Sequence, residues 1–172
     1  KKRKNLRIID SSKIKLENIN SVVSNFNSLL IQSPDNKKFE SKNFQVVSKK
    51  KPSSKIFREL MFALNVCRYV KSNAIVLTSN TRTVGIGSGQ PSRVDSCKIA
   101  IDKMRNFQKV KDNDEIVAAS DAFFPFVDGI ETLVQAGVSA VIQPSGSIRD
   151  KEIIKYANET ETVLVFSKTR HF

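Results

Sequence analysis

From Pro52 onward, apolar and polar positions form a regular pattern that predicts alternating helices and strands. Four segments carry apolar residues at helical spacing and are predicted as helices: from Ser53 or Ser54 to Cys67, from Ser92 to Met104, from Asp128 to Gly137, and residues 149–158. Ser53 or Ser54 can cap the first of them, Asp128 can cap the third, and Gly137 is suited to end it. Five apolar runs are predicted as strands, at residues 74–78, 83–86, 116–119, 138–142 and 162–166. This order indicates an α/β fold, with a mostly parallel sheet, helices on both faces and one antiparallel hairpin turning at Ser79 and Asn80.

Residues 1–50 are more polar and less regular. Apolar runs at 6–9, 29–31 and 44–47 are predicted as strands, separated by loops rich in Ser, Asn and Lys. We therefore divide the chain into an N-terminal segment of strands and loops, 1–50, and an α/β subdomain, 51–172. The first residue is Lys1 rather than Met, so we expect the chain to begin inside a longer polypeptide.

Residues 85–90 form a glycine-rich segment before the second predicted helix. Gln90 stands where a dinucleotide-binding Gly-x-Gly-x-x-Gly motif needs its last glycine, and the Gly-Lys-Ser/Thr ending of a phosphate-binding loop is absent. Ser92 and Asp95 fit a helix-capping pattern. Two interpretations remain open: a structural turn, or a loop that receives a polar ligand at the helix N-terminus.

The segment from Ser120 to Asp128 places three phenylalanines between a predicted strand and a predicted helix, with Asp121 near one end and Asp128 at the other. An apolar loop at the end of a strand suits a flat heterocyclic ligand, since the rings can stack and a carboxylate can accept from amino groups. The alternative is that all three rings fill the core.

The chain carries a net charge of +12, which favours anionic partners. The lysine runs at 1–4, 37–38 and 49–51 are isolated, and no aromatic residues alternate with them as a platform for single-stranded nucleic acid would require. We therefore expect a solvated lysine-rich surface and no nucleic-acid partner.

The remaining chemistry-bearing residues are few. Cys67 and Cys97 occupy apolar helical positions without a Cys-x-x-Cys pair, so we expect buried thiols, no transition metal and a reduced cytoplasmic setting. The one histidine, His171, forms neither a zinc site nor a Ser-His-Asp arrangement. No apolar run approaches the roughly 20 residues of a membrane-spanning helix, so no membrane partner is expected.

Five segments in one order resemble the C-terminal half of the AICAR transformylase domain in the AICAR transformylase/IMP cyclohydrolase family of purine biosynthesis. They are KSNAIV (71–76), TVGIGSGQPSRV (83–94), SDAFFPFVD (120–128), VIQPSGSIRD (141–150) and RHF (170–172). The resemblance runs from about Phe44 to the end of the chain.

That family transfers a formyl group from the co-substrate 10-formyltetrahydrofolate to the 5-amino group of AICAR, an aminoimidazole ribonucleotide. The resemblance implies a cytidine-deaminase-like three-layer subdomain. The zinc-deaminase signature itself is missing, so deamination is not implied. The family resemblance also implies a homodimer with active sites between subunits, and it leaves open whether a monovalent cation is bound.

Residue roles follow from the resemblance alone. It implies AICAR contacts for Asn73, Phe123 and Arg170, and folate contacts for a second group of residues. The second group is Arg93, Val94, Phe126 and Asp128. These are positioning groups that would hold a weakly nucleophilic amine against the formyl carbon.

The family's catalytic Lys-His dipeptide does not occur in this sequence, and no cyclohydrolase domain is recognised, so no catalytic residue is assigned. Val127, where many relatives have Arg, and Pro91 depart from the family pattern. The first hypothesis is therefore an AICAR formyltransferase part that is inactive without the other half of its domain. The second is a non-catalytic basic α/β module that binds nucleic acid or a partner chain.

Overall fold

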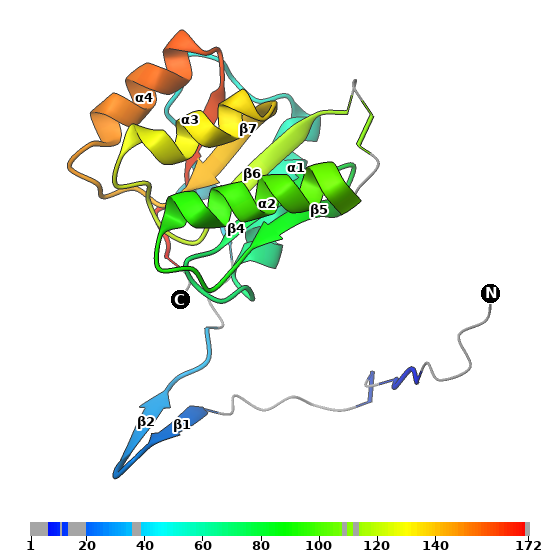
Figure 1. Ribbon diagram of the computed structural model, residues 1–172, viewed down its shortest axis with the longest axis vertical. Coiled ribbons are helices and arrows are strands. Elements are labelled where there is room, and N and C mark those ends of the chain that lie inside the picture. The colour runs from blue at the N-terminus through cyan, green and yellow to red at the C-terminus, as the bar shows by residue number, and fades with distance from the viewer. Residues whose placement is uncertain are drawn as a thin grey trace. The chain divides into compact units, whose positions relative to one another are not determined.

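The computed structural model describes residues 7–10, 12–13, 20–35, 39–107, 110–111 and 114–170 (Figure 1). The chain divides into two compact units, Lys1–Lys38 and Phe39–Phe172.

In the first unit, β1 (Ser21–Asn25) and β2 (Ser28–Gln32) form an antiparallel hairpin. The predicted strand at 29–31 is confirmed within β2, whereas β1 was not predicted. Of the predicted strand at 6–9, residues 7–9 are described and form no strand. Ile8 and Ile9 are exposed, and an apolar run by itself does not make a strand, since the backbone groups of a strand need a pairing partner.

The second unit is built on a six-stranded sheet with the order β3-β8-β7-β6-β4-β5. Its strands are β3 (Gln45–Val46), β4 (Ile75–Ser79), β5 (Arg82–Gly87), β6 (Ile116–Ser120), β7 (Val138–Gln143) and β8 (Val163–Phe166). Each strand coincides with a run predicted as a strand, and its ends differ from the predicted ends by at most one residue. The predicted hairpin between β4 and β5 is confirmed, but its turn lies at Asn80 and Thr81, both at positive φ, one residue later than predicted, because Ser79 still pairs with Arg82.

The prediction of a mostly parallel sheet is wrong, because the sheet is mixed. Only β6–β7 and β7–β8 are parallel pairs, whereas β3–β8, β4–β6 and β4–β5 are antiparallel. The reason is that β4 lies between β5 and β6 and runs against both. The crossover from β5 to β6 therefore passes over β4 instead of joining neighbouring strands.

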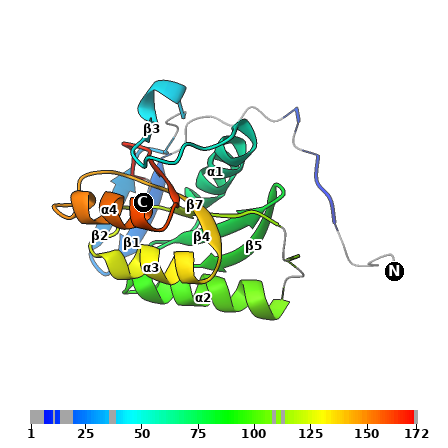
Figure 2. The ribbon, with the colours of Figure 1, turned by 90° about the horizontal axis from the view of Figure 1, so that it is seen from above.

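Helices cover both faces of the sheet, as predicted (Figure 2). The helix α1 (Ser54–Cys67) packs on one face, and α2 (Arg93–Phe107), α3 (Val127–Gln135) and α4 (Asp150–Glu159) pack on the other. A short 3-10 helix, Ser41–Asn43, precedes β3. Alternate residues of β4 belong to two separate cores: Ile75 and Leu77 face α2, and Val76 faces α1. The result is three layers.

The helix termini confirm part of the sequence analysis. Ser53 caps α1, since its hydroxyl accepts from the amide of Ile56 at 3.2 Å. Gly137, at φ +94°, follows the end of α3 as predicted. The predicted cap of α3 by Asp128 is wrong: Phe126 occupies the N-cap position, and Asp128 lies in the first turn, where its carboxylate accepts from Gly129.

Replacing Ser53 with alanine is expected to lower the free energy of unfolding by about 1 kcal/mol, because the amide of Ile56 loses its acceptor. Urea denaturation followed by circular dichroism measures this change. The matched control is Ser139→Ala, which removes a hydroxyl bond to the carbonyl of Ile116 without touching a helix terminus. An Ser53→Ala loss no larger than that of the control would contradict the capping role.

Among the helices of the described residues, none has the length and apolar character to cross a membrane.

Candidate functional site

One edge of the six-stranded sheet gathers the predicted site residues. The strands β5, β6, β7 and β8 all end at this edge, and β4, which runs the opposite way, begins there. Asn73 therefore precedes β4 at the same edge where Asp121 follows β6 and Arg170 follows β8. The N-termini of α2 and α3 also start here, with Arg93 and Asp128 in their first turns. Loops at the carboxyl ends of strands are the usual ligand position in α/β sheets.

The Asn73 side chain makes three hydrogen bonds to the protein. Its amide nitrogen donates to the carbonyls of Gln90, at 2.8 Å, and Pro91, at 3.0 Å, while its amide oxygen accepts from Arg93 Nη2 at 2.8 Å. These partners fix which end of the amide is the acceptor. Both N–H groups are engaged, and Arg93 is the one donor to the amide oxygen among the described residues, so this oxygen can accept a second hydrogen bond.

Arg93 links several segments through its guanidinium. Besides Asn73, Nη2 donates to Asp121 Oδ1 at 3.1 Å, and Nη1 donates to the carbonyl of Phe123 at 3.2 Å. The Asp121 side chain is fully buried and that of Arg93 is 12% exposed. This is a desolvated ion pair rather than a surface one.

A cavity of about 430 Å³ opens beside this network. Five of the seven predicted site residues line it: Asn73, Arg93, Val94, Phe126 and Asp128. Pro91 and Pro125 are also part of the wall. The volume lies in the range of ligand pockets, roughly 300–1,000 Å³.

The other two predicted residues contact each other. The Arg170 guanidinium lies over the Phe123 ring, 4.7 Å from its centroid. The carbonyl of Phe123 in turn accepts from Arg93, so Arg170 joins the same network as Asn73. A similar stack places Arg149 over Phe126 at 4.9 Å. Cations prefer the faces of such rings.

The two interpretations of the three phenylalanines each hold in part. Phe124 is buried in the core, and its amide donates to the buried Gln143 side chain at 2.9 Å. Phe126 is 51% exposed and lines the cavity, and Phe123 is partly exposed under Arg170. One ring anchors the loop and two remain available to a ligand.

The glycine-rich segment also divides between its two interpretations. Gly85 and Gly87 belong to β5, and both pack against the backbone of α2. Gly89 lies in a turn at φ +68°, and its amide donates to the carbonyl of Lys71 at 2.8 Å. The segment is therefore mainly structural, and it positions Gln90 and Pro91 against Asn73.

Both cysteines are buried and free. Burial raises the pKa of the Cys67 thiol, and it raises that of Cys97 to about 12, so neither is a thiolate at neutral pH. The part of the chain that the structure describes holds no group of three or more His, Cys, Asp or Glu suited to a metal ion. His171 lies outside the described residues.

Ser72 was not predicted as a site residue, and Asp121 was predicted only as a carboxylate that could accept from a ligand amino group. The Ser72 hydroxyl donates to Asp121 Oδ2, completing the partners of that carboxylate. The signal was present, because Asp121 opens the phenylalanine loop and Ser72 precedes Asn73. However, sequence alone does not reveal which of two nearby carboxylates is buried.

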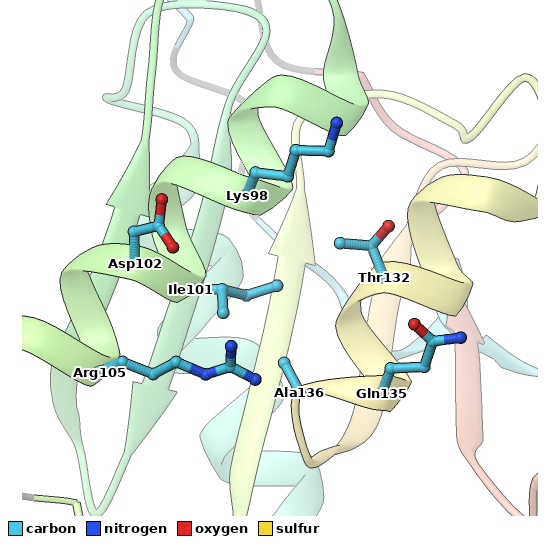
Figure 3. Close-up of a pocket in the computed structure, with 7 residues that line it drawn as sticks. All are labelled: Lys98, Ile101, Asp102, Arg105, Thr132, Gln135 and Ala136. Carbon is cyan, nitrogen blue, oxygen red and sulfur yellow. The ribbon is translucent and has the colours of Figure 1, made fainter.

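A second cavity, of about 320 Å³, lies between α2 and α3, with Lys98 and Arg105 extending toward Thr132 and Gln135 (Figure 3). None of the seven predicted residues lines it. We therefore do not include it in the candidate site.

Comparison with known proteins identifies one family model and several relatives that match this chain. The sequence profile of the AICARFT/IMPCHase bienzyme family matches residues 1–103. The bifunctional purine biosynthesis protein PurH of Chlorobium phaeobacteroides (strain BS1) is 43% identical over 171 residues, which cover 99% of this chain and 32% of that protein. PurH of Bartonella bacilliformis is 48% identical over 149 residues (84% and 28%), and PurH of Buchnera aphidicola subsp. Schizaphis graminum is 42% identical over 173 residues (100% and 33%).

The chain thus spans about a third of the length of the curated relatives it matches. Since the profile covers more than half of its residues, the chain belongs to the AICARFT/IMPCHase bienzyme family.

Proposed function

We propose that this edge of the sheet binds AICAR and 10-formyltetrahydrofolate and takes part in formyl transfer between them, as the C-terminal part of an AICAR transformylase domain. The supporting observation is that Asn73, Arg93 and Phe123 are hydrogen-bonded together beside one cavity. Arg170 joins them through its stack on Phe123. A single ligand region is the simplest use of this arrangement.

AICAR would bind around Asn73, Phe123 and Arg170. Because the Asn73 N–H groups are engaged by backbone carbonyls, its side chain offers a ligand only an acceptor, which suits an amino or carboxamide N–H. Phe123 provides a flat apolar contact for the imidazole ring. The exposed Arg170 suits the phosphate end of the nucleotide.

The folate co-substrate would occupy the cavity lined by Arg93, Val94, Phe126 and Asp128. The exposed Phe126 ring offers a stacking face, and the Asp128 carboxylate can accept from the amino group of a pterin. Both ligands would then meet near Asn73, with the amine held against the formyl carbon.

The roles assigned to this chain are binding and orientation, and the proton-transfer groups would come from elsewhere in the enzyme. No Lys-His dipeptide occurs in the sequence. We therefore propose that formyl transfer requires the other half of the domain, within a cytoplasmic homodimer whose cytidine-deaminase-like subdomains share the active sites. In this scheme residues 1–50 link the two halves, and any bound metal is a monovalent cation.

The test is calorimetric titration of the chain with AICAR and with tetrahydrofolate, beside a formyl-transfer assay. Binding without turnover is expected, and turnover is expected when the remaining two thirds of a PurH relative are supplied. Asn73→Leu should weaken AICAR binding by about 10-fold, the scale of one lost hydrogen bond. The control is Asn65→Leu, an exposed asparagine on α1, across the sheet from α2. Robust turnover by this chain alone, or no binding of either ligand, would contradict the proposal.

The net charge of +12 leaves a basic nucleic-acid-binding module as the rival function. Titration with random-sequence oligonucleotides at 50 and 200 mM salt separates the two. Tight binding that falls steeply with salt, together with no response to AICAR, would favour the module.

A further inference from the structure

Asp121 is a buried carboxylate behind the candidate site, and neither family resemblance nor cavity lining assigns it a role. Its side chain has no exposed surface. Burying a charge is costly unless it is paired and hydrogen-bonded. Asp121 meets this condition through Arg93 on one oxygen and Ser72 on the other.

Hydrogen bonds connect Ser72 to Asp121, Asp121 to Arg93, and Arg93 to Asn73, which lines the cavity. We call these four connected side chains the relay. Arg93 Nη2 lies 3.1 Å from Asp121 Oδ1 and 2.8 Å from Asn73 Oδ1, so one nitrogen contacts both side chains. Nη1 of the same guanidinium holds the carbonyl of Phe123 at 3.2 Å. Because a guanidinium is rigid and planar, fixing it at Asp121 also fixes its other contacts.

We infer that Asp121 is a positioning residue that, together with Ser72, orients the Arg93 guanidinium and through it holds the Asn73 amide with its oxygen toward the ligand. This inference rests on the proposed function for the identity of the ligand. The relay itself depends only on the protein contacts. It assigns Asp121 and Ser72 to the binding machinery without contact to substrate.

A purely structural ion pair would explain these contacts less well. Buried ion pairs contribute little net stability compared with apolar residues of similar volume. Here the pair also leaves Arg93 Nε buried without a hydrogen-bond partner among the described residues. The Arg93 guanidinium is held by Asp121 and by the carbonyl of Phe123, and it donates to the side-chain oxygen of Asn73. That oxygen is the group that the proposed function requires to be oriented.

The test is a double-mutant cycle on AICAR affinity, measured by calorimetry. Asp121→Asn is expected to weaken binding about 10-fold in the otherwise unchanged chain, and less than about 2-fold in the background of Arg93→Met, because residues of one network do not act additively. Ser72→Ala, which keeps the carboxylate, is expected to weaken binding by about 3-fold. Equal losses from Asp121→Asn in both backgrounds would overturn the relay.

The matched control is Glu59→Gln, which neutralises another buried carboxylate. Glu59 is 9% exposed on α1, and its Oε2 accepts from the amide of Thr81 at 2.9 Å, remote from the network. It should lower stability but leave AICAR affinity within about 2-fold, because no residue of the relay contacts it. If Glu59→Gln weakens binding as much as Asp121→Asn, the effect is loss of stability and the inference fails.

Two further measurements separate failure of the inference from failure of the proposed function. If Asp121→Asn does not fold, Ser72→Ala combined with Arg93→Met completes the same cycle. If the unchanged chain binds no AICAR, the proposed function fails, and side-chain amide exchange of Asn73 by nuclear magnetic resonance still tests the relay. Exchange should be at least about 10-fold faster in Asp121→Asn or Ser72→Ala than in Glu59→Gln. Unchanged exchange would overturn it.

Discussion

Replacing Arg93 with methionine is expected to weaken AICAR binding by at least about 100-fold and to lower the free energy of unfolding by about 3 kcal/mol. The substitution removes the donors to Asn73, Asp121 and Phe123 while keeping a side chain of similar length. It leaves the Asp121 carboxylate buried without its cation, which is the costly way to break a buried pair. Urea denaturation measures the loss in the free energy of unfolding, and calorimetric titration measures the loss of affinity.

The control for Arg93→Met is Arg149→Met, which removes another arginine at the same edge. Arg149 is exposed, lies over Phe126 and pairs with Glu152 at 3.1 Å. Exposed ion pairs and exposed cation–π contacts contribute up to about 1 kcal/mol each, so a much smaller loss of stability is expected. If the two substitutions cost the same, Arg93 is not the centre of a buried network.

The positions of the four α-helices and of the strands of the six-stranded sheet could be predicted because each has a local signal, whereas β1 was missed and the run at 6–9 was wrongly predicted as a strand. Ser53 and the apolar spacing after it predicted α1, and the turn at Asn80 predicted the β4–β5 hairpin. Local signals do not determine which strands become neighbours. The position of β4 between β5 and β6 is determined by tertiary packing. It makes the sheet mixed, whereas the sequence predicted a mostly parallel sheet.

The same limit applies to the candidate site. The motifs around Asn73, Phe123 and Arg170 were predicted to meet, and the structure joins them through Arg93. The role of Asp121 was not predicted. A carboxylate in a loop reads as a ligand contact in sequence, whereas its complete burial follows from the packing of α2 and the β4 entry around it. Asp128 was predicted to cap α3, but it lies within the first turn of that helix.

The position of the Arg93 side chain depends on how closely α2 packs on β5, and two glycines on β5 permit the close approach. A Cβ at Gly85 would lie 2.0 Å from the carbonyl oxygen of Ala100, and one at Gly87 would lie 1.9 Å from that of Ser96. Two residues along a strand and four along a helix both span roughly 6–7 Å, so the pair of glycines matches consecutive turns of α2. Both obstacles are backbone atoms, which no side-chain rotation can relieve.

Gly87→Ala is therefore expected to lower the free energy of unfolding by about 3 kcal/mol or more, because the added methyl group forces β5 and α2 apart. AICAR binding should fall with it, since α2 carries Arg93 away from Asn73. The control is Gly137→Ala, where no atom lies within 4 Å of the added Cβ and only the positive φ of +94° opposes alanine. That control should cost about 1 kcal/mol and leave affinity unchanged. Equal losses of stability and affinity from the two substitutions would contradict the requirement for close approach of α2 to β5 at Gly87.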